Sequence, residues 1–385
     1  MNPQSATQRL LNPFEWYRQQ RETAPVAQDP RGMWMAFGYD DVQRVLSDYA
    51  SFSSAFGRDT ESLSNPLGAS IISSDPPRHR QLRSLVTQAF TPRTVARLEP
   101  RIVGIVAELL DTVAPTGTMD IIEDFAYPLP VIVIAELLGI PPEDRARFKQ
   151  WSDAVVTGTR TAAMAGRDPT AEMNAYFLDM IERRKRAPQS DLISSLLAAQ
   201  IDEQHLSLVE LLGFCVLLLV AGNETTTNLI GNAMLCFDEH PEAWEQLRAH
   251  PELLPGAIEE VLRYRSPVQS MFRASVAEVT LGGQVIPAGR PIIAWIGSAN
   301  RDASRFPEPD TFDISRNPNR HLAFGHGIHF CLGAPLARLE AQIALSALLT
   351  RLPDPRRTRA VPLEPLESSI VYGVRHLPVT FTPSD

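Results

Sequence analysis

The apolar and polar positions of this 385-residue chain alternate mainly with the helical period. Apolar side chains recur every three or four residues between Thr94 and Val113, and the apolar segment from Pro128 to Leu138 predicts a second helix. A long helix is predicted from about Ser207 to Glu239. Many of the 32 prolines separate such helix-length intervals. We therefore expect a mainly α-helical protein.

Strand-like segments are few and short. Two of them run from Met33 to Phe37 and from Pro291 to Trp295, and a third, Val279 to Ile286, contains a Gly282-Gly283 pair that predicts a hairpin turn. No repeat or Gly/Ser-rich linker divides the sequence, and 44% hydrophobic residues suffice for a sizeable core. We expect small β-sheets beside the helices, and a single domain over residues 1–385.

Charge and hydropathy exclude several classes of protein. A net charge of -9 argues against a protein that binds nucleic acid or an anionic membrane surface. The longest apolar stretch, Leu211 to Gly222, is shorter than the roughly 20 residues that span a bilayer. The N-terminal segment carries Arg9, Glu15 and Arg18 and lacks the apolar core of a signal peptide. We expect a soluble cytoplasmic protein without a membrane anchor.

One of the three cysteines stands in unusual surroundings. Cys215, Cys236 and Cys331 show no C-x-x-C spacing, which argues against a disulfide scaffold or a structural zinc site. A cysteine in an apolar setting is usually a packed small hydrophobe. The segment Phe324–Gly333, however, surrounds Cys331 with glycines, just before a predicted helix that begins at Ala334-Pro335-Leu336. A thiolate stabilised by a helix N-terminus and approached closely by backbone suits a haem iron.

A polar segment interrupts the long apolar helix at Ala221-Gly222-Asn223-Glu224-Thr225-Thr226. An interior glycine weakens a helix by about 1 kcal/mol relative to alanine. The presence of glycine and polar residues in this helix therefore indicates a packing or functional role for the segment. One interpretation is a helix kink in which threonine hydroxyls bond to backbone carbonyls. The other is proton delivery, because an acid beside an alcohol can pass protons through water to dioxygen as it is activated.

The cysteine segment resembles a known signature. Residues 324–333 match F-G-x-G-x-H-x-C-x-G, which is the haem-binding pattern of the cytochrome P450 monooxygenases. The resemblance, closest to short soluble bacterial members, implies a P450 fold with haem b between the oxygen-activating helix and the helix after the cysteine. It implies that Cys331 binds the iron, and that Glu224 and Thr225 are the acid–alcohol pair. Phe324, Gly325 and Gly333 would then border the haem.

A charged pair also resembles the family. Glu260 and Arg263 lie three residues apart on one helix face, where such a pair is usually an exposed surface bridge. The pair is similar to the Glu-x-x-Arg of cytochromes P450, a structural pair beneath the haem loop. Many members complete a triad with an arginine in Pro-x-Arg-Phe, but this chain has Pro309-Asp310-Thr311-Phe312. Arg316 and Arg305 are the two candidates for the third member of the triad.

The resemblance also implies ligands for the two haem propionates, which need cationic donors. His79 and Arg83 lie four residues apart in a helix that is predicted to begin after Asp75-Pro76-Pro77. Arg273 and His329 occupy matching family positions. A surface location for His79 and Arg273 is the alternative interpretation.

Family position also indicates the substrate pocket. Its side chains are nearly all apolar, which implies a lipophilic substrate such as a fatty acid, steroid or terpenoid; at these spacings, the same residues also fit a protein core. The segment from Thr157 to Pro169 is expected to form a mobile lid over the entry. The expected lining residues are Leu63, Leu67, Ile71, Leu217, Ala221, Val268, Met271 and Val371.

Monooxygenation requires electrons from outside, and the sequence has no G-x-G-x-x-G fingerprint or fused iron–sulfur segment. The resemblance implies a monomer that is reduced by a ferredoxin or flavodoxin with its reductase, and Arg80 and Arg338 are candidates for docking that acidic donor. Three other functions remain open. They are a peroxygenase of the same fold that uses hydrogen peroxide, a non-catalytic haem sensor or carrier, and a hydrolase with Cys331 as nucleophile and His329 as base.

Overall fold

The structure is a computed structural model that describes residues 3–55, 63, 65–148, 150–151, 168–201 and 203–383. The chain forms two compact units from interleaved segments. The first unit comprises residues 1–53, 103–126 and 225–385, and the second comprises residues 54–102 and 127–224. Helices dominate the described residues, as the sequence predicts. A single haem domain over the whole chain stays a prediction.

Among the described residues, the first unit contains the three sheets and seven of the α-helices. Its helices are α1 (Pro3–Leu11), α2 (Phe14–Thr23), α3 (Tyr39–Ser47), α13 (Pro241–Ala249), α14 (Leu254–Tyr264), α15 (Ile296–Ala299) and α16 (Ala334–Arg351). Its strands are β1 (Val26–Gln28), β2 (Trp34–Ala36), β3 (Phe52–Ser53), β4 (Thr118–Asp120), β5 (Met271–Ser275), β6 (Val279–Leu281), β7 (Gln284–Ile286), β8 (Pro291–Ala294), β9 (Arg356–Arg357) and β10 (Pro378–Thr380).

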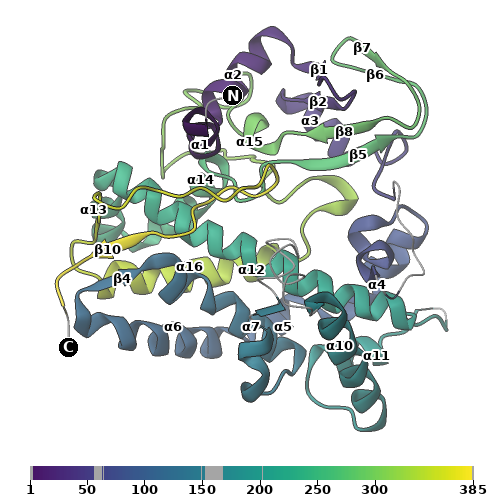
Figure 1. Cartoon of the computed structure of the whole chain (residues 1–385), viewed down its shortest axis with the longest axis horizontal. Helices are drawn as coiled ribbons and strands as arrows, with labels where there is room; N and C mark the ends of the chain where they lie inside the picture. Colours follow the sequence, from purple (N-terminus) through teal and green to yellow (C-terminus); the bar gives the residue numbers. More distant parts are fainter. Residues whose placement is uncertain are drawn as a thin grey trace. The chain divides into compact units, whose positions relative to one another are not determined.

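The largest sheet has the strand order β1-β2-β8-β5-β3, and its buried apolar side chains Phe52 and Ile292 belong to the same core cluster as Val45 of α3. Figure 1 shows α3 and α15 beside this sheet, and both helices contact each other. A three-stranded sheet has the order β4-β10-β9, and β6 and β7 form the hairpin predicted at Gly282-Gly283. Both glycines have positive φ, +53° and +77°, which is why this turn takes glycine.

The second unit contains α4 (Arg78–Ala89), α5 (Pro92–Ala96), α7 (Pro128–Leu138), α10 (Pro169–Arg186) and α11 (Leu192–Ala198). A buried ion pair between Arg184 and Asp191 joins α10 to the start of α11. Asp191 also caps α11, because its carboxylate accepts a hydrogen bond from the Ser194 amide at 2.8 Å. The Arg184 guanidinium donates a further bond to the Gly139 carbonyl just after α7, at 3.0 Å. These contacts tie three helices together.

Two helices continue from one unit into the other: α6 (Glu99–Val113) and α12 (Leu208–Glu239). The observed α12 and α7 match the predicted segments almost to the residue. The single helix expected from Thr94 to Val113 is wrong, because α5 ends at Ala96 and α6 begins at Glu99. Pro100 explains the break: its ring clashes with the carbonyl four residues earlier, but it is tolerated in a first helical turn.

Helix α12 is long and apolar enough, by length and composition, to cross a bilayer. It also carries polar side chains that are fully buried, including Asn223 and Asn232. The Asn232 amide donates to the backbone carbonyls of Arg265 and Tyr372, both at 3.1 Å. Buried polar side chains that bond to the backbone of other segments are typical of the central helix of a folded unit.

Candidate functional site

The Cys331 segment folds into a closed loop in the first unit. The Cys331 amide donates to the Phe324 carbonyl at 2.8 Å, and the Gly325 amide donates to the Leu322 carbonyl at 2.8 Å. Helix α16 begins three residues after Cys331, with Pro335 in its first turn, as predicted. The loop therefore holds the sulfur just ahead of a helix N-terminus, where a thiolate is favoured.

Exposure separates Cys331 from the other two cysteines. Cys331 is half-buried, whereas Cys215 and Cys236 are buried within α12. Burial raises the pKa of both α12 thiols to about 12, so neither ionises near neutral pH. Only Cys331 among the three is placed to act as a ligand or nucleophile.

Glycines fix how the Cys331 loop packs. A Cβ at Gly327 would lie 2.8 Å from the Ser47 Cα at the end of α3, and the residue has a φ of +71°. A Cβ at Gly333 would lie 3.9 Å from the Cys331 sulfur. The first glycine lets the loop sit directly on α3, whereas a Cβ at position 333 would make only an ordinary van der Waals contact with the sulfur.

Glu260 and Arg263 of α14 form a completely buried ion pair, with N–O distances of 2.7 and 2.8 Å. Both side chains have 0% exposure, so the surface-bridge interpretation is wrong. The Arg263 guanidinium also donates to the backbone carbonyls of Asn300, Pro309 and Thr311. The pair thereby holds the chain segment that leads to the Cys331 loop.

Arg316 is the third member that the sequence left open. Its Nε atom lies 3.2 Å from Glu260, and its side chain is largely buried. Arg305 instead pairs with Asp40 at the surface. Glu260 also accepts hydrogen bonds from the Asp313 amide at 2.9 Å and from the Asn319 side chain at 3.0 Å. With these partners the buried carboxylate is well satisfied.

A second charged cluster, not predicted from the sequence, joins α14 to α16. Arg338 donates two hydrogen bonds to Glu259, at 2.7 and 2.8 Å, and the His321 Nε2 atom lies 3.0 Å from the same carboxylate. Burial raises the carboxyl pKa, but the bonds from Arg338 and His321 outweigh it and lower the pKa of Glu259 to about 2. The Arg338 guanidinium also lies 4.5 Å from the Phe324 ring. Arg338, a candidate docking residue, therefore also braces the loop.

The polar segment of α12 keeps its helical geometry throughout. A Cβ at Gly222 would lie 2.5 Å from the Ile134 side chain, so close packing of α7 explains this glycine. The Thr227 hydroxyl donates to the Ala126 carbonyl at 3.1 Å. Glu224 and Thr225 are both half-buried, so water can reach the acid and the alcohol.

A buried carboxyl group lies next to this segment, in the first unit. Glu340 of α16 is 2% exposed, and its side chain is hydrogen-bonded to that of Thr226. Burial raises its pKa to about 8, even though the bond with Thr226 acts in the opposite direction. Glu340 is not among the residues predicted from the sequence. The available signal was a glutamate four residues after Leu336 and four before Ala344, on a face of α16 that is otherwise apolar.

The candidate propionate ligands come from both units. In the first unit, Arg273 is buried in β5 and donates to the Phe272 carbonyl at 2.8 Å, and His329 is half-buried in the turn before Phe330. In the second unit, His79 and Arg83 lie one turn apart on α4, with His79 buried. The surface interpretation therefore fails for both His79 and Arg273.

The predicted pocket residues are arranged as follows. In the first unit, Val268 and Val371 pair through a β-bridge, and the Gln269 amide donates to the Ile370 carbonyl at 2.7 Å. In the second unit, the turn at Pro66 lies on α12, since a Cβ at Gly213 would meet the Pro66 carbonyl at 2.3 Å. Val268, Val371, Met271, Leu67, Ile71 and Leu217 are half-buried, whereas Leu63 and Ala221 are exposed.

The candidate docking residue Arg80 is exposed on α4 in the second unit. The other candidate docking residue, Arg338, belongs to the first unit and is partly exposed, with 38% of its side chain accessible. The expected lid from Thr157 to Pro169 lies almost entirely outside the described residues.

The Cys331 region fits the haem b that its signature implies. Cys331 is half-buried and directly follows Phe330, a large apolar side chain that is 42% exposed and offers surface for a planar apolar group. Over the described part of the chain, no group of three His, Cys, Asp or Glu side chains could hold a metal ion. One protein ligand with the remaining ligands supplied by a macrocycle suits this donor set.

Comparison with known proteins identifies the family. A model of the family "Cytochrome P450" matches residues 4–126 and 160–353. The chain is 47% identical over 382 residues to cytochrome P450 109 of Bacillus spizizenii, with 97% of this chain and 92% of that protein covered.

Solved structures agree with this match. Substrate-free CYP109E1 of Bacillus megaterium is 44% identical, with a TM-score of 0.93 over 97% of this chain and 100% of that chain. Its complex with testosterone is 45% identical, with a TM-score of 0.88 over 96% and 99% of the two chains. P450BioI, in complex with an acyl carrier protein ligated to hexadec-9Z-enoic acid, is 37% identical, with a TM-score of 0.90 over 98% and 100%.

The members of this family use haem b. Because the family model covers most of the sequence and the relatives align over nearly their whole length, this chain belongs to the cytochrome P450 family and is a haem-dependent monooxygenase.

Proposed function

We propose that this cytochrome P450 hydroxylates a lipophilic substrate, such as a fatty acid, steroid or terpenoid, at an unactivated carbon. The observation that carries the proposal is the half-exposed Cys331 sulfur in a glycine-rich loop ahead of α16. The substrate class is supported by the apolar side chains at the pocket positions and by two relatives, whose structures contain testosterone and a hexadecenoyl carrier protein. We place the protein in the cytoplasm as a monomer.

In this proposal Cys331 binds the haem iron. Phe324, Gly325 and Gly333 would border the macrocycle. When bound, haem supplies the redox chemistry that activates dioxygen. Arg273 and His329, together with His79 and Arg83, neutralise the two propionates by charge-assisted hydrogen bonds.

The proposed proton path begins at Glu224 and Thr225. Both side chains are half-buried on α12, which allows the carboxyl group to exchange protons with solvent and the hydroxyl to pass them on. The neighbouring Thr226 is held by the buried Glu340, so that α12 is anchored to α16 at this point. This anchor fixes the helix next to the acid–alcohol pair.

Glu260, Arg263 and Arg316 are assigned a positioning role. They contact no reacting group, but their buried hydrogen bonds hold residues 300–319, which lead into the Cys331 loop. Precise placement of the sulfur depends on such support, since a ligand held loosely binds its metal weakly.

Val268, Met271, Val371, Leu67, Ile71 and Leu217 are proposed to contact the substrate through their partly exposed apolar surfaces. Leu63 and Ala221, which are exposed, are the two remaining residues proposed to contact the substrate. Burying a lipophilic molecule against such side chains is favourable by about 25 cal/mol for each Å² of apolar surface removed from water. The pocket thus selects for apolar area rather than for a particular polar group.

Electrons are proposed to come from a separate ferredoxin or flavodoxin with its reductase. Arg80 and Arg338 are the proposed contacts for this acidic partner, and their charges speed the encounter more than they tighten the complex. Because Arg338 also holds Glu259, Arg80 is the cleaner residue for mutagenesis.

Ligand-induced spectral titration of the purified holoenzyme tests the substrate class. We expect testosterone and hexadecenoic acid to shift the haem spectrum at micromolar concentration, and sugars and polar amino acids to have no effect. Binding confined to polar compounds would contradict the proposal. Product formed with a ferredoxin system, rather than with hydrogen peroxide alone, distinguishes the monooxygenase from a peroxygenase.

A further inference from the structure

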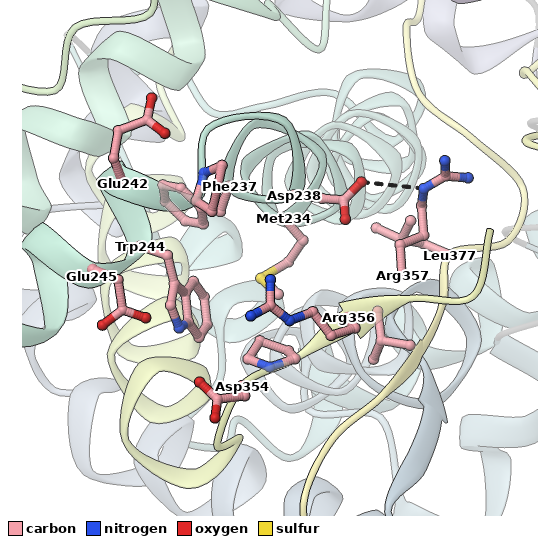
Figure 2. Close-up of a pocket in the computed structure, with 13 residues that line it drawn as sticks. Met234, Phe237, Asp238, Glu242, Trp244, Glu245, Asp354, Arg356, Arg357 and Leu377 are labelled. Atoms are coloured by element: carbon pink, nitrogen blue, oxygen red, sulfur yellow. Dashed lines mark hydrogen bonds and ion pairs between the residues drawn. The ribbon is translucent and has the colours of Figure 1, made fainter.

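A cavity of about 230 Å³ lies within the first unit, apart from every residue assigned above to haem or substrate. Figure 2 shows its lining, which comes from three regions of the chain: the end of α12, helix α13, and the segment around β9 and β10. The lining residues are Met234, Phe237, Asp238, Pro241, Glu242, Trp244, Glu245, Asp354, Pro355, Arg356, Arg357, Leu377 and Val379.

The floor of this cavity is apolar and aromatic. Met234, Phe237, Trp244, Leu377 and Val379 are all at least nine-tenths buried. The Phe237 and Trp244 rings meet edge to face, with centroids 5.7 Å apart, so this wall is rigid. A preformed apolar wall of this kind favours a ligand with an apolar body.

Two hydrogen-bond donors at the cavity lack acceptors. The indole Nε1 atom of Trp244 is buried and, within the residues that the structure describes, has no hydrogen-bond partner. The described residues likewise provide no ion-pair partner for the Arg356 guanidinium, which Figure 2 shows directed toward Met234 and Trp244. An indole N–H can only donate, and so can a guanidinium. A negatively charged hydrogen-bond acceptor, such as a carboxylate, would therefore satisfy both the Trp244 N–H group and the Arg356 guanidinium.

Carboxylates surround the same cavity. Asp238 is neutralised, because it lies 3.2 Å from Arg357 and 3.1 Å from Arg359. Glu242, Glu245 and Asp354 are exposed around the opening and outnumber Arg356. A simple anion would be repelled by these three groups, whereas a ligand that also carries an ammonium group would be attracted.

We propose that this cavity binds a small zwitterion with an apolar side chain, such as an apolar α-amino acid. The carboxylate bonds to Trp244 and Arg356, the ammonium group faces the carboxylates at the opening, and the side chain packs on Met234 and Phe237. The volume equals that of about eight water molecules, which suits a molecule of roughly a dozen non-hydrogen atoms. The site goes beyond the monooxygenase reaction, because none of its residues belongs to the proposed haem or substrate contacts.

Isothermal titration of the purified holoenzyme with three matched probes tests this inference. L-Phenylalanine carries both charges, 2-phenylethylamine lacks the carboxylate, and 3-phenylpropanoate lacks the ammonium group. We expect L-phenylalanine to bind with a Kd of about 1 mM or tighter, and at least tenfold more tightly than either of the others. No binding of L-phenylalanine, or equal binding of all three probes, would overturn the proposal.

Variants locate the site. Trp244→Phe removes the N–H group but keeps an aromatic ring, and Arg356→Gln removes an exposed charge; each is expected to weaken L-phenylalanine binding at least fivefold. Arg248→Gln is the matched control, since Arg248 is an exposed arginine of α13 that does not line the cavity, and the affinity of this variant for L-phenylalanine should be unchanged. If Trp244→Phe and Arg356→Gln both bind like the parent protein, the ligand binds elsewhere and the proposal is wrong. Because Arg356 is exposed, its variant keeps the test decisive if Trp244→Phe does not fold.

Discussion

The buried carboxyl group of Glu340 makes the stability of the fold depend on pH. Its pKa is raised from 4.5 to about 8 in the folded protein, chiefly by burial. Between these two values the folded state keeps the proton while the unfolded state has lost it. The contribution of Glu340 to stability is therefore greatest below pH 4.5 and falls as pH rises toward 8. At 1.36 kcal/mol per pKa unit the full loss is about 5 kcal/mol, of which about 3 kcal/mol has occurred by pH 7.

Replacing Glu340 with glutamine removes the titrating group but keeps its shape and its contact with Thr226. We expect Glu340→Gln to gain stability relative to the parent protein as pH rises from 5 to 8, by an amount on the order of 4 kcal/mol. The glutamine amide also introduces N–H donors that need hydrogen-bond partners, and this changes the free energy of unfolding of the variant by the same amount at every pH. The pH slope of the difference, rather than its value at one pH, is therefore the quantity to measure.

Thermal unfolding of the haem-loaded proteins, followed by circular dichroism from pH 5 to 9, provides the assay. Glu259→Gln is the control: bonds with Arg338 and His321 lower the pKa of Glu259 to about 2, so this carboxylate is ionised in both the folded and unfolded states from pH 5 to 9, and the stability difference between Glu259→Gln and the parent protein should not change with pH over that range. Its carboxylate stabilises the fold above about pH 4.5 and loses that effect as pH falls toward 2. Parallel pH profiles for the parent and Glu340→Gln proteins would refute the reasoning.

Three further substitutions test other parts of the site. Arg263→Gln leaves the Glu260 carboxylate without its main partner in a fully buried position, so we expect a loss of about 3–5 kcal/mol, seen as poor haem incorporation and a lower unfolding temperature; unchanged values would contradict the positioning role. Thr225→Ala should lower product formation and raise peroxide leakage while leaving substrate-induced spectral shifts intact, and an unaltered ratio of product to peroxide would remove Thr225 from the proton path. Arg80→Glu should slow reduction by the ferredoxin without changing substrate affinity, and equal reduction rates would exclude Arg80 from docking.

The sequence predicts those features of the structure that a local pattern of residues encodes. Helices α7 and α12 were predicted almost to the residue, because their strongly apolar segments are bounded by proline and polar residues. The break between α5 and α6 was missed, although Pro100 provided a signal. The haem loop was found because its chemistry needs a fixed short pattern of glycine, histidine and cysteine.

Contacts between distant segments could not be predicted in the same way. The choice of Arg316 over Arg305 as the partner of Glu260 depends on how residues 300–319 fold, which no local pattern specifies. The burial of Glu340 likewise depends on the elements packed around α16. The cavity at Trp244 is assembled from segments more than a hundred residues apart, so only the folded chain reveals it.

The central claim is that Cys331 ligates a haem iron through its thiolate. The absorption spectrum of the reduced, carbon monoxide-bound protein tests it most directly. We predict the red-shifted Soret band of a thiolate-ligated haem for the parent protein and for Cys236→Ala, a control at a buried cysteine, and loss of that band in Cys331→Ser. A parent spectrum without the shifted band, or a Cys331→Ser variant that retains it, would contradict the account.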